Sequence, residues 1–218
     1  MRRRLILLRH GEVDYFPQGS PVPPEGVGLT ERGRVQARAV GALLRDVPLD
    51  LALHTGLRRT EETLALVLEG REVGVEAWPE FREIRPGRLR DLPDPERAFR
   101  EAFRPQSLEE RFLGGERYQD FLERVLAAYR RLLERPWGTL LLVAHGGVIR
   151  ALLSYALTGR PGFLPMEVHP CGLSVLDLGE EGGLLRLHNL TPYELLPKTR
   201  LATMEELWEA YRGGDRGG

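Results

Sequence analysis

The sequence carries the stretch Leu5-Ile6-Leu7-Leu8-Arg9-His10-Gly11, and the same plan returns at Leu140-Leu141-Leu142-Val143-Ala144-His145-Gly146. Each stretch is a short apolar run, typical of a strand buried on both faces of a sheet, that ends in a histidine and a glycine. In open α/β sheets, ligands bind at the carboxyl ends of the strands. If the two strands are neighbours, His10 and His145 meet at one edge of the sheet.

Strand and helix patterns alternate along the rest of the chain. Further strands are predicted at 49–53, 73–78, 139–144, 172–178 and 184–190, with a hairpin around 181–183. Helices are predicted at 30–45, 57–68, 95–112, 116–133 and 147–157, with loops at 11–28 and 80–95. This alternation predicts an α/β fold in which helices cover both faces of a largely parallel sheet.

The first predicted helix has a clear start signal. Thr30 is a suitable N-cap. Its apolar residues, Val35, Ala39, Ala42 and Leu43, are expected to share one face.

Composition narrows the class of protein. The 218 residues are 42% hydrophobic and 29% charged, which predicts a folded chain with a substantial core. The net charge of −1 gives no general attraction for nucleic acid or for an anionic membrane. Cys171 is the single cysteine, so no disulfide framework is expected. The apolar start is too short for a signal peptide and no segment suits a membrane span, so a cytoplasmic location is predicted.

The residues near the two histidines suit phosphate chemistry. Arg9 lies beside His10, and Arg59 follows the second predicted strand; the planar guanidinium matches phosphate oxygens. Such cations are expected to depress the pKa of a nearby imidazole and leave a neutral nitrogen that can attack phosphorus. A carboxylic acid in the 80–95 loop, such as Glu83, could protonate the leaving group.

Other chemistries find less support. A cysteine phosphatase needs an arginine six residues after its cysteine, where this chain has Asp177. There is no phosphate-binding loop for nucleoside triphosphates, and the five histidines show no close metal-ligand spacing. A single histidine at a strand end is more often structural than functional. Two histidines in the same context, one of them beside an arginine, give a functional role the same weight as a structural one.

The Arg9-His10-Gly11-Glu12 run resembles the Arg-His-Gly signature of the histidine phosphatase superfamily, also called the phosphoglycerate mutase-like family. Further matches follow in the family's order: Leu29 and Thr30 with Gly33, Gln36 and Ala37; His54 to Arg59 with Thr63; Phe81 to Ile84 with Gly87; Gly114 to Glu116 with Arg124 and Val125; and Val143 to Arg150. The resemblance covers about residues 4–190. One Arg-His-Gly run is a weak signal, whereas the same run with the further motifs in order is a strong one.

The resemblance implies a role for each site residue. His10 is the phosphorylated nucleophile, and Glu83 is the proton donor that next activates water in hydrolysis. Arg9, Arg59 and His145 hold the phosphate, helped by the N–H of Gly146. No metal or cofactor is implied, because this clamp already supplies the positive charge.

The resemblance also implies an architecture. It is a three-layer α/β/α sandwich with a mostly parallel central sheet and a helical lid insertion. We expect a single domain over 1–218, with the lid at about 84–136 and a C-terminal tail at about 191–218.

Two positions depart from the family's pattern. Val13-Asp14-Tyr15-Phe16 stands where the family often has Thr or Ser before a Trp-Asn pair, so the asparagine that touches phosphate is missing. Either Tyr15 or a backbone N–H takes its place. His54 and Thr55 replace two serines, and we expect His54 to be structural rather than catalytic.

Several reactions compete. A phosphomonoesterase acting on a small phosphorylated metabolite comes first, and a phosphoglycerate-type mutase second. Cofactor-dependent mutases of the family carry an Arg-Arg pair and a proline run after the acid loop, which 89–114 lacks. A binding module without catalysis is disfavoured because His10, His145 and Glu83 are all present, and a phosphohistidine-protein phosphatase would be a shorter chain. The substrate stays open among α-ribazole phosphate, a sugar phosphate, a phosphoglycerate and a broad range.

Two further segments have more than one interpretation. The series Arg82, Arg85, Arg88 and Arg90 is expected to be a solvated loop, with the far end of an anionic substrate as the alternative. The stretch 204–211 is a short amphipathic helix that packs on its own domain or, as the less favoured alternative, on a second subunit in a homodimer.

Overall fold

The computed structural model describes residues 2–17, 22–194 and 201–214. Its centre is a six-stranded sheet in the order β3-β2-β4-β1-β5-β6. The strands are β1 (Arg3–Arg9), β2 (Leu51–His54), β3 (Val75–Ala77), β4 (Thr139–Ala144), β5 (Leu173–Gly179) and β6 (Gly182–Leu190). β1, β2, β3 and β4 run parallel, while β5 and β6 form the antiparallel hairpin predicted around 181–183.

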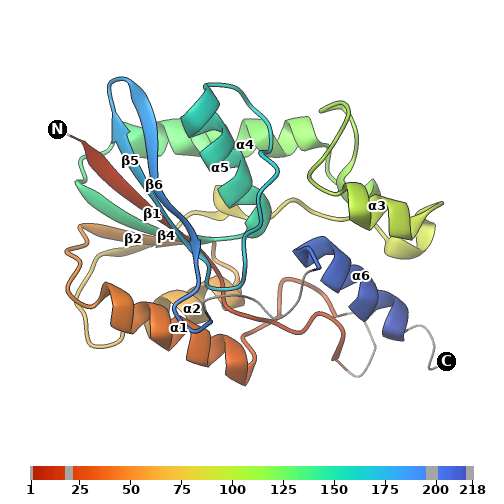
Figure 1. The fold of residues 1–218 in the computed structure, drawn as a ribbon, viewed down its shortest axis with the longest axis horizontal. Helices are drawn as coiled ribbons and strands as arrows, with labels where there is room; N and C mark the ends of the chain where they lie inside the picture. Colours follow the sequence, from red (N-terminus) through yellow and green to blue (C-terminus); the bar gives the residue numbers. More distant parts are fainter. Residues whose placement is uncertain (1, 18–21, 195–200, 215–218) are drawn as a thin grey trace.

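Helices cover both faces of the sheet, which confirms the predicted three-layer α/β/α architecture (Figure 1). α1 (Glu31–Leu44) and α2 (Arg58–Val67) lie on one face, and α4 (Tyr118–Leu133) and α5 (Gly146–Thr158) on the other. The alternation of side chains along β1 explains the layers. Leu5 and Leu7 pack in the core with α4 and α5, whereas Ile6 and Leu8 pack in the core with α1 and α2.

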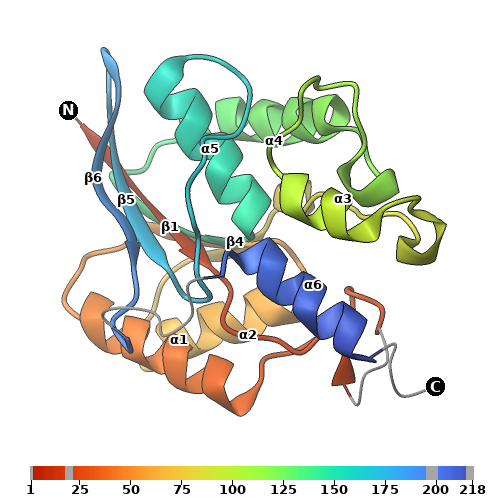
Figure 2. The same ribbon diagram turned by 45° about the vertical axis from the view of Figure 1, so that its right-hand side comes forward.

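Two helices lie beyond the edge of the sheet. α3 (Pro95–Glu101) and α6 (Thr203–Gly214) contact each other, and α6 lies between α3 and the loop that follows β1 (Figure 2). The predicted division into one domain, a lid insertion and a tail stays a prediction. No helix in the described part of the chain is long and apolar enough to cross a membrane.

The apolar residues expected to share one face of α1 are not the residues that α1 buries. Thr30 is the N-cap, and its side chain accepts from the Gly33 N–H, as predicted. However, Val35 is 61% exposed and Leu43 46% exposed. Apart from Val40 and Leu44, the buried positions are small or polar: Gly33, Gln36 and Ala37. The buried residues are small because the loop after β1 packs closely on this face of α1. A Cβ on Gly33 would lie 2.3 Å from the carbonyl oxygen of Glu12, which is too close.

The helix predicted at 95–112 was also too long. Asp94 caps α3, which ends at Glu101. Phe103 has a φ of 62°, in the left-handed region, which breaks the helix. Pro105 also disfavours a helical conformation for Arg104 before it. The chain then forms turns and a short 3₁₀ helix, Phe112–Gly114, before α4 begins.

Candidate active site

The two histidines meet because β1 and β4 are parallel neighbours. Arg9 is opposite Ala144 in the sheet, and the His10 N–H donates to the Ala144 carbonyl at 3.0 Å. The imidazole rings of His10 and His145 lie 5.2 Å apart, centre to centre, at an angle of 61°. The arrangement expected from the two repeated stretches is therefore present at the carboxyl edge of the sheet.

The hydrogen bond of His10 fixes which nitrogen is free. Nδ1 lies 2.8 Å from the Gly11 carbonyl oxygen, and because a carbonyl only accepts, Nδ1 carries the proton. Burial, with the positive charges of Arg59 and Arg9, lowers the pKa of His10 well below its usual value. The ring is therefore neutral around pH 7, and Nε2 keeps the lone pair that a nucleophile needs.

His145 is held by a chain of hydroxyl groups. Thr60 Oγ1 donates to the Leu57 carbonyl at 2.7 Å, so Thr55 Oγ1, 3.1 Å away, donates to Thr60. Thr55 Oγ1 can then only accept from His145 Nε2, at 2.9 Å. Burial and the neighbouring His10 lower the pKa of His145 well below its usual value. The proton of the neutral ring thus lies on Nε2, and Nδ1 has a free lone pair.

Some buried polar atoms of the site have no hydrogen-bond partner. Among the described residues, the buried side-chain N and O atoms without a partner are Arg9 Nε, Arg59 Nε and His145 Nδ1. Each arginine is nevertheless fixed by another nitrogen: Arg9 donates to the Val168 carbonyl at 2.6 Å and Arg59 to the Pro24 carbonyl. Buried polar groups in proteins are nearly always satisfied. The two unpaired donors, Arg9 Nε and Arg59 Nε, indicate that an external anion completes the site.

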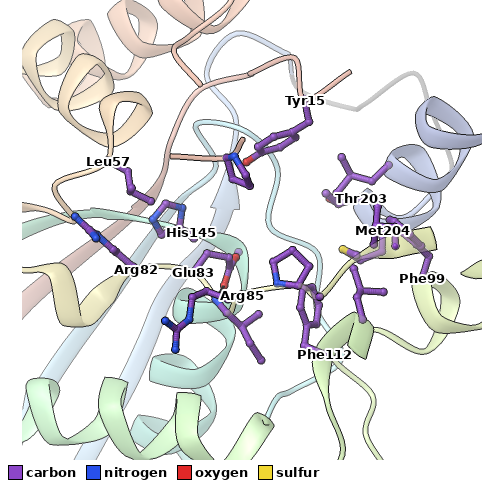
Figure 3. A pocket seen from close by; sticks show the side chains of 18 of the residues that line it. Tyr15, Leu57, Arg82, Glu83, Arg85, Phe99, Phe112, His145, Thr203 and Met204 are labelled. Atoms are coloured by element: carbon purple, nitrogen blue, oxygen red, sulfur yellow. Dashed lines mark hydrogen bonds between the residues drawn. The ribbon is translucent and has the colours of Figure 1, made fainter. Parts of the chain in front are cut away.

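Glu83 is the carboxyl group of the site; it is partly buried and lies beside His145 (Figure 3). Burial raises the pKa of Glu83 above its usual value, although hydrogen bonds from the Gly147 and Ile84 N–H groups oppose the shift. The Gly147 bond is 2.9 Å long. A Cβ on Gly147 would lie 2.3 Å from Glu83 Oε1, so only glycine leaves room for this carboxyl group. A carboxyl group with a raised pKa is suited to donate a proton.

The other expected residues have different positions. Gly146 begins α5 and lines the pocket. Tyr15 lines the pocket too, with the Arg59 guanidinium 5.9 Å from its ring centre. His54 Nδ1 accepts from the Gly56 N–H at 3.1 Å. Its ring binds its own loop, as a structural histidine does.

Several supporting residues had no role assigned from the sequence. Thr60 and Thr63 are buried polar side chains on the inner face of α2, and Thr63 Oγ1 accepts from the Gly11 N–H at 3.0 Å. Arg150 is buried on α5 and contributes positive charge near Glu83. Buried polar residues three and four positions from apolar ones on a helix are the signal that could have revealed them.

The pocket that contains these groups has a volume of about 1010 Å³. One side is the phosphate-sized cradle of the strand ends. Another side is the loop with Arg82, Arg85, Arg88 and Arg90, all of which line the pocket and are exposed or nearly so. In the described ranges, no group of three or more His, Cys, Asp or Glu side chains could hold a metal ion.

The fold and the site place the chain among enzymes of phosphate esters, and the comparisons agree. Residues 5–191 match the histidine phosphatase superfamily (branch 1), and the chain belongs to that family. It is a phosphatase that acts on a small phosphorylated molecule.

Individual relatives support this membership. The chain is 34% identical to the adenosylcobalamin/alpha-ribazole phosphatase of Salmonella typhimurium over 161 residues, which cover 71% of this chain and 80% of the relative. It is 28% identical to the "Probable phosphoglycerate mutase GpmB" of Salmonella paratyphi A, over 81% of this chain and 86% of the relative. The crystal structure of the alpha-ribazole phosphatase from Shigella flexneri superposes with a TM-score of 0.71 at 29% identity, covering 89% of this chain and 100% of that one.

Proposed function

We propose that this chain is a metal-independent phosphomonoesterase that works through a phosphohistidine on His10. The observation that carries the proposal is a pair of unpaired buried N–H donors, Arg9 Nε and Arg59 Nε, beside the neutral imidazole of His10. A phosphate group supplies the acceptor oxygens that these two donors lack. The Gly146 N–H at the start of α5 adds a donor at a helix N-terminus.

The first half of the reaction transfers the phosphoryl group to the enzyme. The Nε2 lone pair of His10 forms the N–P bond while the ester P–O bond breaks. The proton of Glu83 goes to the leaving alkoxide, which departs as the alcohol. The positive charges of Arg9 and Arg59 stabilise the charge that develops on the phosphoryl oxygens.

The second half returns the enzyme to its starting state. Glu83, now a carboxylate, takes a proton from water, and the water oxygen forms a new P–O bond while the N–P bond breaks. Inorganic phosphate leaves, and His10 is neutral again. A mutase would instead return the phosphoryl group to a bound acceptor. This is the second candidate function, because one relative is named a probable phosphoglycerate mutase.

The partners follow from the same proposal. A small phosphorylated substrate is the ligand, without nucleic acid or membrane, and the names of the α-ribazole phosphatase relatives support a small ester of this kind. The cytoplasmic location and a homodimer stay predictions.

The test is p-nitrophenyl phosphate hydrolysis by the wild type, His10→Ala and a control, Glu180→Ala, at an exposed position of the β5–β6 turn that does not line the pocket. We expect His10→Ala to lose on the order of 10⁴-fold or more in kcat, as when a nucleophile is removed, and the control to stay within about twofold, because a surface change away from the site has little effect. Rapid acid-free quenching of the wild type with labelled substrate should trap an acid-labile phosphoenzyme. Retained activity in His10→Ala would remove His10 from this role, and phosphoglycerate isomerisation without phosphate release would favour the mutase.

A further inference from the structure

The pocket extends past the phosphate cradle to a wall that is apolar. Met204, Leu207 and Tyr211 of α6 line the pocket. Their spacing of three and four residues places them on one face of the helix. Phe99 of α3 and Phe16 of the loop after β1 line the same side. Figure 3 shows Met204 and Phe99 across the pocket from His145 and Glu83.

Aromatic contacts hold this wall together. The ring of Tyr211 lies 5.9 Å from that of Phe16 and 6.2 Å from that of Phe99, the latter at an interplanar angle of 18°. Trp208, on the adjoining face of α6, lies 5.8 Å from Phe99. Three segments far apart in the sequence therefore converge on one surface, and α6 is the element that joins them.

The start of α6 is tied to the catalytic groups. The backbone N–H and the hydroxyl of Thr203 both donate to Glu167 Oε2, at 3.2 and 2.8 Å. Thr203 Oγ1 also accepts from Arg9 at 3.5 Å. Because Met204 is the next residue, the apolar wall begins directly beside the phosphate cradle. The leaving group of an ester whose phosphate fills the cradle can therefore lie against this wall.

We propose that α6, with Phe99 and Phe16, forms the leaving-group subsite, and that it selects phosphate monoesters of apolar alcohols. This inference rests on the proposed phosphatase activity. The family match ends at residue 191, so α6 is a feature of this chain outside the matched region. Of the wall's side chains only Tyr211 carries a polar atom, so a carboxylate or a hydroxyl-rich group would lose hydration here without gaining partners.

The arginine loop is the competing site for a leaving group, and three of its arginines are engaged within the chain. Arg82 donates to the Thr55 carbonyl at 3.2 Å. Arg85 lies 3.5 Å from Glu116, and Arg90 lies 3.8 Å from Asp91. The ion pairs of Arg85 and Arg90 partly neutralise the positive side of the pocket, which favours the apolar wall as the surface that selects the substrate.

An alkyl phosphate series tests the subsite. Ethyl, butyl and hexyl phosphate release alcohols of nearly equal pKa, so they make the same demand on the acid and differ in apolar length. The value of kcat/KM covers the steps up to release of the alcohol, and we expect it to rise about two- to fourfold per methylene, the factor that burial of a methylene provides. A flat series in the wild type, or faster turnover of 3-phosphoglycerate than of hexyl phosphate, would overturn the proposal.

Two variants of α6 sharpen the test. Met204→Gln keeps the length of the side chain but makes it polar, and we expect it to lower kcat/KM for hexyl phosphate about tenfold. Ethyl phosphate turnover and inhibition by inorganic phosphate should stay within about twofold. Met204→Leu, which keeps the wall apolar, should restore the chain-length dependence. The exposed Glu206→Gln is the control that should leave the whole series unchanged. Trp208 fluorescence reports whether α6 stays docked.

The outcomes separate the two proposals. Equal losses on ethyl and hexyl phosphate in a docked Met204→Gln variant would contradict the subsite and leave the phosphatase standing. If no ester is hydrolysed and His10→Ala matches the wild type, the phosphatase itself fails. If Met204→Gln undocks α6, the wild-type chain-length series alone decides.

Discussion

The two ends of the pocket are built in different ways. At the phosphate end, His10 and His145 are 3% and 1% exposed and follow directly from strands β1 and β4. At the opposite end, Met204 and Tyr211 are partly buried on a helix that aromatic packing and the hydrogen bonds of Thr203 to Glu167 hold in place. Short motifs next to strands thus encode the chemistry, whereas packing between distant segments encodes the shape that the leaving group meets.

Glu83 lies beside His145 at the phosphate end, and its replacement should give the largest effect that depends on the leaving group. We expect Glu83→Gln to lower kcat/KM for hexyl phosphate by about 10² to 10⁴, the usual contribution of a general acid. p-Nitrophenyl phosphate needs less protonation, so its loss should be about tenfold or less in the same variant. The ratio of the two kcat/KM values is the measurement. Equal losses on both esters would show that Glu83 is not the proton donor.

The pH profile offers a second comparison of the same groups. His10 has a lowered pKa, so it stays neutral into mildly acidic solution; Glu83 has a raised pKa, so it stays protonated above the usual range of a carboxyl group. For hexyl phosphate, kcat/KM should therefore fall as pH rises through the pKa of Glu83, up to about tenfold per pH unit. The decline should be shallower for p-nitrophenyl phosphate. A decline of equal steepness for both esters in the wild type would contradict the assignment.

The Thr55–Thr60 chain tests how strictly the phosphate end is fixed. Thr55→Val keeps the shape but leaves His145 Nε2–H without an acceptor, which costs about 1–3 kcal/mol for a buried donor. We expect about tenfold weaker inhibition by inorganic phosphate. Thr55→Ser should restore it. The nitrogen chemical shifts of His145 report its tautomer, and an unchanged Nε2–H tautomer with unchanged inhibition in Thr55→Val would show that the chain has no positioning role.

Metal removal should have the smallest effect of all. Arg9 and Arg59 already supply positive charge and donors around the phosphate, so EDTA should leave kcat and KM for p-nitrophenyl phosphate unchanged. Wild-type enzyme dialysed against EDTA, with and without added Mg²⁺ or Zn²⁺, makes the comparison. A loss of activity that the metal restores would mean that the cradle is incomplete as described.

The contrast between the motif-encoded phosphate end and the packing-encoded α6 end explains which features the sequence could predict. β4 was predicted at its observed bounds, Thr139–Ala144, because a run of apolar residues that ends in His-Gly leaves few alternatives. The meeting of His10 and His145 followed from that. The apolar residues of α1 did not reveal its buried face, because that face is selected for small size as well as for hydrophobicity. The loop after β1 packs directly on α1 at Gly33, where a side chain would not fit.

The role of α6 was beyond sequence reasoning for a physical reason. Its pattern showed an amphipathic helix, and the structure confirms a helix at Thr203–Gly214. An apolar face, however, does not say which surface it covers. The contacts of Tyr211 with Phe16 and Phe99 join positions almost two hundred and more than one hundred residues apart, and no local pattern carries that information.

The place of β1 in the sheet has a consequence for how the protein is made. β1 is synthesised first, yet both its neighbours, β4 and β5, come from residues after 138. At about 5–20 residues per second, translation leaves the apolar run from Leu5 to Leu8 without a strand partner for on the order of ten seconds. An unpaired apolar strand invites association with other chains. The nascent chain therefore depends on chaperones or on early packing with α1 until β4 emerges, and no phosphate cradle exists before His145 has left the ribosome.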